Sequence, residues 1–211
     1  MQAARGASLT SDETTPTRPT PRTRQLTLFA LVAVLGYAAD LATKELALER
    51  LEPGQGVPLV GDWFGLFLTF NSGAAFSLGT SYTLVLSCIA IVAAGVTLWS
   101  VRRLRSTGWA LGLGFLLAGI LGNLTDRVFR EPSPLRGHVV DFLRFPNFPV
   151  FNVADICINI AAAFIIIQAL RGMRVDGTRD GQAAGDTGDD TGDGDTRHVG
   201  GTEGPSGVRE P

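Results

Sequence analysis

Residues 82–101 read YTLVLSCIAIVAAGVTLWSV, twenty consecutive residues without a charged side chain. A helix of about 20 apolar residues is long enough to cross the roughly 30 Å of hydrocarbon in a bilayer. Backbone N–H and C=O groups cannot stay unpaired in hydrocarbon, so such a run has to be helical. The stretch therefore predicts a transmembrane helix, and it makes the chain an α-helical integral membrane protein.

Three further apolar runs lie on either side of this one, and each is close to the length of a membrane span. They are Leu26–Leu48, Trp109–Leu124 and Val150–Leu170. Only 18% of the 211 residues are charged, against about 25% in an average soluble domain. We predict a four-transmembrane-helix bundle over residues 25–171, with helices at 26–48, 82–101, 109–124 and 150–170.

The two ends of the chain differ from this apolar body. Residues 1–24 are rich in Thr, Pro and Arg, and residues 172–211 are rich in Gly, Asp and Thr. The formal charge of −2 divides into +4 on residues 1–175 (15 Lys and Arg, 11 acids) and −6 on residues 176–211 (3 Arg, 9 acids). Such segments bury too little apolar surface to fold. We expect a disordered N-terminal tail over 1–24 and a disordered acidic, Gly-rich tail over 172–211.

The distribution of basic residues predicts the orientation, because cytoplasmic loops carry an excess of Lys and Arg. Arg lies in the N-terminal tail, in the short loop 102–108 and directly after the last span, whereas loop 49–81 holds one Arg beside three acids. Both termini are therefore expected in the cytoplasm, as in a multi-pass plasma-membrane protein. A cleaved secretory signal ending near Ala38 is the alternative, but the apolar pattern continues past Asp40.

Loop 49–81 contains two β-prone runs, Val57–Val60 and Trp63–Phe70, separated by Gly61-Asp62. Aromatic residues recur through the second run, and aromatic side chains favour the interface between membrane and water. We predict a small extracytoplasmic β-rich domain on the outer membrane surface.

Ionisable residues inside apolar runs carry the functional information, because a charge in the bilayer costs on the order of 3 kcal/mol. Asp40 and Lys44 are four residues apart and share one helix face, so they form either a structural ion pair or part of a site. Asn152, Asp155 and Asn159 follow at i, i+3 and i+7, and this polar stripe is expected to face the bundle interior.

Asp141 lies among apolar residues, fourteen positions before Asp155. Two carboxylates that meet in a partly dry site repel each other and share a proton, as the acid pair of an aspartic protease does. A proton-coupled transporter and a scaffold tied by Asp40–Lys44 and Asp126–Arg127 remain alternatives. A proton relay should cross the bilayer, yet the acids gather on the predicted outer side. Two Cys inside apolar runs predict neither a disulfide framework nor a zinc site.

Four blocks in fixed order resemble the bacterial lipoprotein signal peptidases (signal peptidase II). The blocks are Asp40-Leu-Ala-Thr-Lys44, then Phe70-Asn71-Ser-Gly73-Ala-Ala-Phe-Ser77, then Gly122-Asn123-Leu-Thr-Asp126-Arg127 with Gly137-His-Val-Val-Asp141-Phe142, and finally Phe151-Asn152-Val-Ala-Asp155. The resemblance implies a membrane-embedded aspartic endopeptidase. Its substrates would be diacylglyceryl-modified prolipoproteins, from which it removes the signal peptide by cutting before the lipid-modified Cys.

By the same resemblance, Asp141 and Asp155 are the catalytic pair near the outer face of the membrane. The residues that line and brace the site would be Asp40, Lys44, Asn71, Gly73, Asn123, Asp126, Arg127 and Asn152. Leu41 stands where the family has Gln, which puts in doubt any contact of that amide. The expected partners are lipid-modified prolipoproteins and membrane lipid, with no nucleic acid, cofactor or metal ion, and the protein is expected to be a monomer.

Overall fold

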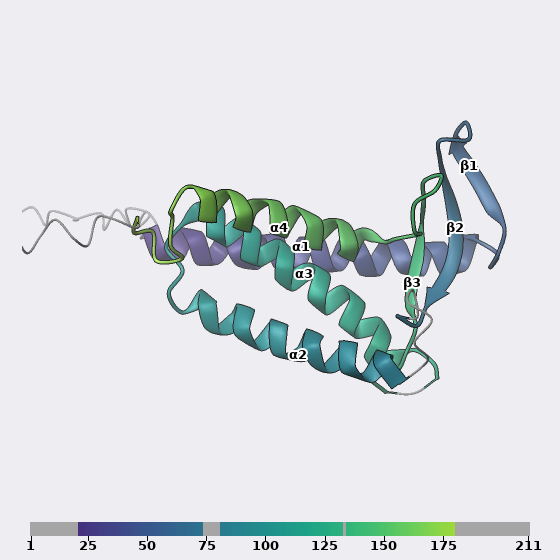
Figure 1. Cartoon of the computed structure of the whole chain (residues 1–211), viewed down its shortest axis with the longest axis horizontal. Coiled ribbons are helices and arrows are strands. Elements are labelled where there is room, and N and C mark those ends of the chain that lie inside the picture. The colour runs from purple at the N-terminus through teal and green to yellow at the C-terminus, as the bar shows by residue number, and fades with distance from the viewer. Residues whose placement is uncertain (1–20, 74–80, 133, 180–211) are drawn as a thin grey trace, which may run out of the picture. The chain divides into compact units, whose positions relative to one another are not determined.

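The computed structural model describes residues 21–73, 81–132 and 134–179. In chain order its elements are α1 (Pro21–Arg50), β1 (Gly56–Val60), β2 (Phe64–Asn71), α2 (Ser81–Val101), α3 (Thr107–Phe129), β3 (Val139–Arg144) and α4 (Val153–Leu170). Figure 1 shows the helices running lengthwise and the three strands together beyond one end of them. All four helices are long and apolar enough to cross a membrane, which agrees with the predicted bundle.

Helix α3 is the centre of the bundle, because it packs against α1, α2 and α4. Small residues allow these close approaches. A Cβ added to Gly119 would lie 2.5 Å from the carbonyl oxygen of Ala154 on α4, and one added to Gly114 would lie 2.9 Å from Val32 Cβ on α1. Lipid is as apolar as a side chain, so helices in a bilayer associate through such packing and through hydrogen bonds rather than through the hydrophobic effect.

The helix ends differ from the predicted ones. Helix α1 begins at Pro21, so residues 21–24 are helical although they were expected in the tail. Pro suits the first turn of a helix, where its missing N–H has no intrahelical partner. Helix α3 continues five residues beyond Leu124, because its last turn carries polar groups that are paired inside the protein. Helix α4 begins only at Val153, because Asn152 caps it.

The strands form one antiparallel sheet in the order β1-β2-β3. The two predicted runs are β1 and β2, whereas β3 was missed, since Asp141 interrupts its apolar pattern. Four of the six residues of β3, Val139 to Phe142, are buried. The register sets Thr69 opposite Asp141 and Asn71 opposite Val139. The sheet therefore holds the segment around Asp141 against the protein.

Residues 172–179 were predicted to belong to the disordered tail, and the structure corrects this. The indole Nε1 of Trp109 donates to the carbonyl of Met173 at 2.7 Å, and the backbone N–H of Arg105 donates to the carbonyl of Val175 at 3.0 Å. These bonds tie the segment to the first turn of α3 and to the loop before it, a long-range pairing that composition does not reveal. The rest of both predicted tails, 1–20 and 180–211, lies outside the described residues.

Candidate active site

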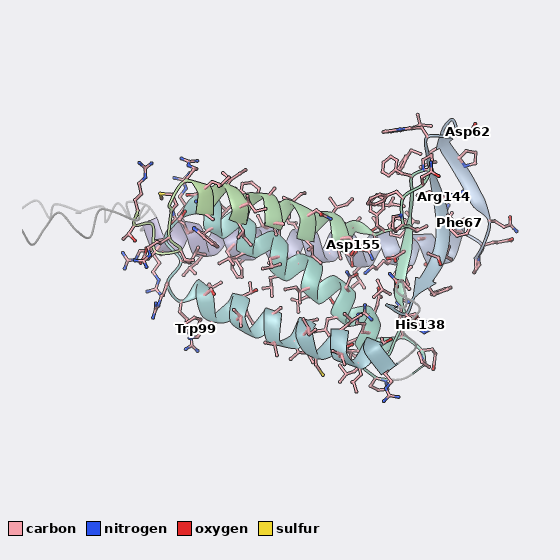
Figure 2. The ribbon with its side chains drawn as sticks, in the orientation of Figure 1. Asp62, Phe67, Trp99, His138, Arg144 and Asp155 are labelled. Atoms are coloured by element: carbon pink, nitrogen blue, oxygen red, sulfur yellow. The ribbon has the colours of Figure 1, made fainter. Side chains whose placement is uncertain are left out.

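Asp141 and Asp155 come from different elements and line the same groove. Asp141 is in the middle of β3, and Asp155 is in the first turn of α4. The groove has a volume of about 1020 Å³, and its walls are the segment between β3 and α4 and one face of α4 itself. Figure 2 shows Asp155 on the part of α4 nearer the sheet, far from Trp99 near the end of α2. The structure thus brings together the two acids that the sequence singled out.

Asn152 contacts both carboxylates. Its side-chain Nδ2 donates to Asp141 Oδ1 at 2.6 Å, and its backbone N–H donates to Asp155 Oδ2 at 3.1 Å. The same residue is the N-cap of α4, since its Oδ1 accepts a hydrogen bond from the backbone N–H of Asp155 at 3.0 Å. Reciprocal bonds of this kind form a capping box. The local rule that starts the helix therefore also fixes the position of Asp155.

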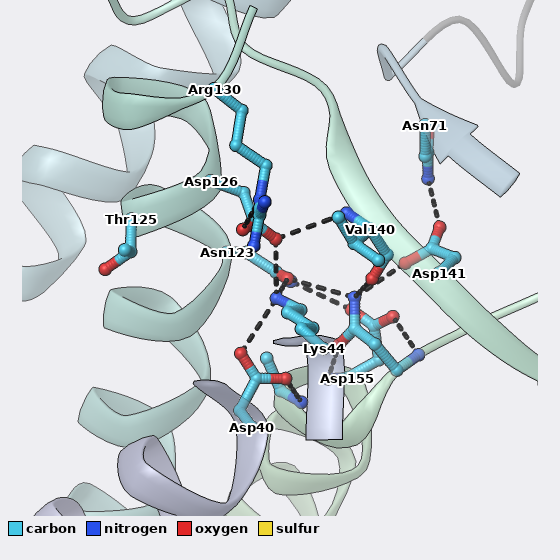
Figure 3. Close-up of polar contacts among 12 residues, drawn as sticks. Asp40, Lys44, Asn71, Asn123, Thr125, Asp126, Arg130, Val140, Asp141 and Asp155 are labelled. Atoms are coloured by element: carbon cyan, nitrogen blue, oxygen red, sulfur yellow. Dashed lines mark hydrogen bonds and ion pairs between the residues drawn. The ribbon is translucent and has the colours of Figure 1, made fainter. Parts of the chain in front are cut away.

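Two further asparagines complete the hydrogen bonding, as Figure 3 shows. Asn71 at the end of β2 donates from Nδ2 to Asp141 Oδ2 at 3.0 Å. Asn123 of α3 donates from Nδ2 to Asp155 Oδ1 at 3.0 Å. Each of the four carboxylate oxygens thus receives a hydrogen bond from a neutral amide.

The pKa of Asp141 is raised from its usual 3.8 to about 6, chiefly by burial and in smaller part by the nearby charge of Asp155. Hydrogen bonds from Asn71 and Asn152 act in the opposite direction, because they stabilise the ionised form. Only 2% of the Asp141 surface is exposed, so burial is the larger effect. Near neutral pH this carboxyl can both hold and release a proton.

A buried cation lies behind the pair. The ammonium group of Lys44, which is fully buried, contacts Asp40 Oδ2 and Asp126 Oδ2, each at 2.8 Å, and donates to Asn123 Oδ1 at 3.1 Å. The ammonium is therefore held by ion pairs with two acids and by one hydrogen bond to a neutral amide. The ion pair that the spacing of Asp40 and Lys44 suggested is present, and it is joined by a second acid from α3.

The acids of this cluster also hold the backbone beside each carboxylate of the pair. Asp126 Oδ2 accepts from the backbone N–H of Val140 at 3.2 Å, one residue before Asp141. Asp40 Oδ1 accepts from the backbone N–H of Ala154 at 2.7 Å, one residue before Asp155. The Lys44 cluster therefore positions β3 and the start of α4 relative to each other.

Sequence reasoning missed two residues of this cluster, Arg130 and Glu45. Arg130 Nε contacts Asp126 Oδ1 at 2.5 Å, and its Nη2 contacts Glu45 Oε1 at 2.7 Å. The suggested Asp126–Arg127 pair is wrong, since Asp126 binds Lys44 and Arg130 instead. The spacing of Asp126 and Arg130, four residues apart on one helix, was the available signal.

Arg127 and Gly73 lie close to each other. A Cβ on Gly73 would meet the Arg127 guanidinium at 3.8 Å and Leu86 at 2.5 Å, and the φ of Gly73 is +83°, so both space and backbone favour glycine there. Its N–H donates to Asn71 Oδ1 at 2.8 Å and thereby turns the Asn71 amide nitrogen toward Asp141. Arg127 Nη1 is buried without a hydrogen-bond partner in the described part of the chain.

The polar stripe on α4 does not face the bundle interior throughout. Asn152 is buried, whereas Asn159 is exposed and lines the groove. Asn152 precedes the helix and has extended backbone angles (φ −134°, ψ −176°), so the helical period does not relate it to Asn159. Leu41, the departure from the family motif, is partly buried on α1. Motif residues 74–77 lie outside the described residues. Within the described residues, no group of three or more His, Cys, Asp or Glu could hold a metal ion.

Comparison with known proteins supports the resemblance that the motifs carry. A family model described as signal peptidase (SPase) II matches residues 32–171. A lipoprotein signal peptidase from Mycobacterium avium is 48% identical over 153 residues, which cover 72% of this chain and 84% of that one. The lipoprotein signal peptidase of Rhodococcus jostii is 47% identical over 169 residues, or 79% and 83% of the two chains.

The fold has solved counterparts as well. A bacterial membrane enzyme determined by the in meso method at 1.9 Å resolution superposes with a TM-score of 0.63 at 26% identity, and the match covers 69% of this chain and 94% of that one. A second such structure, at 2.3 Å resolution, gives a TM-score of 0.61 at 25% identity. The predicted helical membrane fold is confirmed.

Proposed function

The chain belongs to the signal peptidase II family of aspartic-type peptidases, and from this premise we propose that Asp141 and Asp155 are its catalytic pair. The observation that carries the proposal is Asn152, which donates hydrogen bonds to both carboxylates and so holds them at one site. Both acids also line the same groove.

In the proposed mechanism, the pair holds one proton between two carboxyl groups. The raised pKa of Asp141 makes it the carboxyl that carries this proton in the resting enzyme. The protonated Asp141 donates to the carbonyl oxygen of the scissile peptide, while the ionised Asp155 takes a proton from the attacking water. The water oxygen bonds to the carbonyl carbon and forms a gem-diol. The C–N bond then breaks as Asp155 passes its proton to the leaving nitrogen, and the gem-diol returns a proton to Asp141 as it becomes the new carboxyl group.

The groove also suits a substrate that arrives through the membrane. Its lining is mainly apolar and aromatic, with Phe145, Phe148 and Phe151 near the pair and Ile156 and Ile160 along α4. We propose that the signal peptide of a diacylglyceryl-modified prolipoprotein occupies this groove and is cut before the lipid-modified Cys. With both termini in the cytoplasm, as the Arg distribution predicts, the pair lies near the outer face.

Cleavage of a purified lipidated prolipoprotein tests the assignment. We expect Asp141→Asn and Asp155→Asn each to lower the rate by at least about a thousandfold, because one carboxylate can then no longer exchange a proton with its partner. Asp62→Asn, in the turn between β1 and β2, is the matched control and should cleave normally. Both inactive variants should remain folded in the membrane, and full activity in either of them would refute the catalytic pair.

An unlipidated form of the same substrate tests the specificity. We expect wild-type enzyme to cleave it much more slowly, because the groove would lose the contacts of the acyl chains. Equal rates for both forms would refute the proposed requirement for the lipid.

A further inference from the structure

Asn159 is a polar side chain in an apolar place. Between Asp155 and Gln168, helix α4 reads ICINIAAAFIII, and Asn159 is the one residue of that stretch with a side-chain amide. The side chain is exposed rather than packed inside the bundle. It lies one helical turn beyond Asp155 and lines the same groove, between the apolar residues Ile156 and Ile160.

The orientation of the Asn159 amide is fixed by its own helix. Its Nδ2 donates to the backbone carbonyl of Asp155 at 2.9 Å. The nitrogen therefore points back toward Asp155, and the side-chain oxygen is left to accept a hydrogen bond. Within residues 21–73, 81–132 and 134–179, no group donates to that oxygen. An acceptor without a donor is costly in an apolar surrounding.

A peptide that is cut inside a membrane has backbone N–H groups that need acceptors. Its segment inside the bilayer is helical, because only a helix pairs its own backbone groups there. Close approach of a carboxyl pair to one peptide bond requires local unwinding of that helix. Unwinding leaves backbone N–H groups without partners, next to the scissile bond and still at the depth of the groove.

We propose that Asn159 binds the substrate, its Oδ1 accepting a hydrogen bond from a backbone N–H of the unwound signal-peptide segment just before the scissile bond. This inference rests on the proposed function, because it requires a peptide in the groove. It assigns the wall of α4 from Ile156 to Ala163 to the signal-peptide side of the cut. Asn159 is then a residue that binds and aligns the peptide, and it takes no part in proton transfer.

Kinetics with the full-length enzyme and a lipidated prolipoprotein test this role. Asn159→Leu keeps a similar volume and removes the acceptor, and we expect kcat/KM to fall about tenfold, mainly through a higher KM, which is the size of one neutral hydrogen bond. Ile167→Leu, on the exposed surface of the same helix outside the groove, is the control and should match wild type. Unchanged kcat/KM in Asn159→Leu would overturn the inference.

Modified substrates distinguish a direct hydrogen bond to Asn159 from a general distortion of the groove by the substitution. Substrates with an ester in place of one backbone amide, at successive positions before the scissile bond, each lack a single N–H. At one position wild-type enzyme should lose about tenfold, and Asn159→Leu should lose nothing further, because the two changes remove the same bond. Equal losses in both enzymes at every position would overturn the contact. Failure of wild-type enzyme to cleave the unmodified lipidated substrate would instead refute the proposed function itself.

Discussion

Neutral amides, and not cations, are the immediate partners of the two carboxylates. Within the described parts of the chain, every side-chain hydrogen bond that Asp141 and Asp155 accept comes from an asparagine, namely Asn71, Asn123 or Asn152. A Lys or Arg in direct contact would stabilise the ionised form strongly and pull a pKa down. Here the Lys44 ammonium donates to Asn123, and its charge lowers the pKa of Asp141 less than burial raises it, so that pKa stays at about 6.

The pH dependence of cleavage should report this balance. If Asp141 carries the shared proton, kcat/KM falls as pH rises through about 6, because the pair then loses that proton. Asn71→Ala removes a hydrogen bond that favours the ionised form, so the pKa of Asp141 rises and the alkaline limb moves to higher pH. The pH–rate profiles of wild type and Asn71→Ala measure the position of this limb, and Trp109→Phe at the far end of the bundle is the control. An alkaline limb that moves to lower pH in Asn71→Ala would contradict the argument.

Among the elements, the helices were predictable and their ends were not. Apolar runs of the right length identify all four helices, since the bilayer imposes that length. The end of α3 depends on Asp126, whose partner Lys44 lies 82 positions earlier on α1. Strand β3 depends on pairing with β2, about 70 residues earlier in the chain. Such distant partners cannot be predicted from local composition.

The candidate site was predictable in its motif residues and not in its contacts. The family motifs named the two acids and their eight neighbours, and the structure gathers these residues around one site. Which of them pair was not evident: Asp126 binds Arg130 rather than Arg127. Spacing along a helix gives several candidate partners, and only the packing of α1 against α3 selects among them.

Glycine positions on different helices should respond differently to a methyl group. Gly119→Ala on α3 would drive a Cβ into the backbone of α4 at Ala154, so we expect a large loss of stability. Gly95→Ala on α2 meets nothing within 4 Å and should be neutral or slightly stabilising, because Ala favours helix. Thermal unfolding in detergent compares the two variants. Similar melting temperatures would show that α3 and α4 do not pack as closely as described.

Each end of the bundle has its own set of hydrogen bonds that hold the helices together. At the sheet end, Asp40 of α1 holds the start of α4 through Ala154. At the other end, Met173 and Val175 accept hydrogen bonds from Trp109 in the first turn of α3 and from Arg105 in the loop before it. Helix α2 contacts mainly α3, so its connections at the two ends matter for holding it in place.

Truncated chains should distinguish the contribution of residues 173–179 to stability from that of the acidic tail. A chain ending after Arg179 retains the bonds of Met173 and Val175 and should melt and cleave like the full chain. A chain ending after Gly172 loses the bonds to Trp109, Arg105 and Ser106, and we expect a melting temperature several degrees lower, since each bond contributes about 1 kcal/mol. Thermal unfolding and cleavage assays check both chains. Equal melting temperatures of the two truncated chains would argue that the bonds of Met173 and Val175 do not stabilise the bundle.

The two ion pairs within single helices bear on how the protein is assembled. Asp40 and Lys44 are four residues apart on α1, and Asp126 in the last turn of α3 is four residues before Arg130, which caps that helix. During synthesis α1 enters the bilayer before α3 exists, and a lone Lys or Asp there would oppose insertion. Because each helix brings its own counter-ion, it can insert as a nearly neutral segment. Docking of α1 and α3 then adds the bond from Lys44 to Asp126, so the charged cluster behind the site is completed only when the bundle closes.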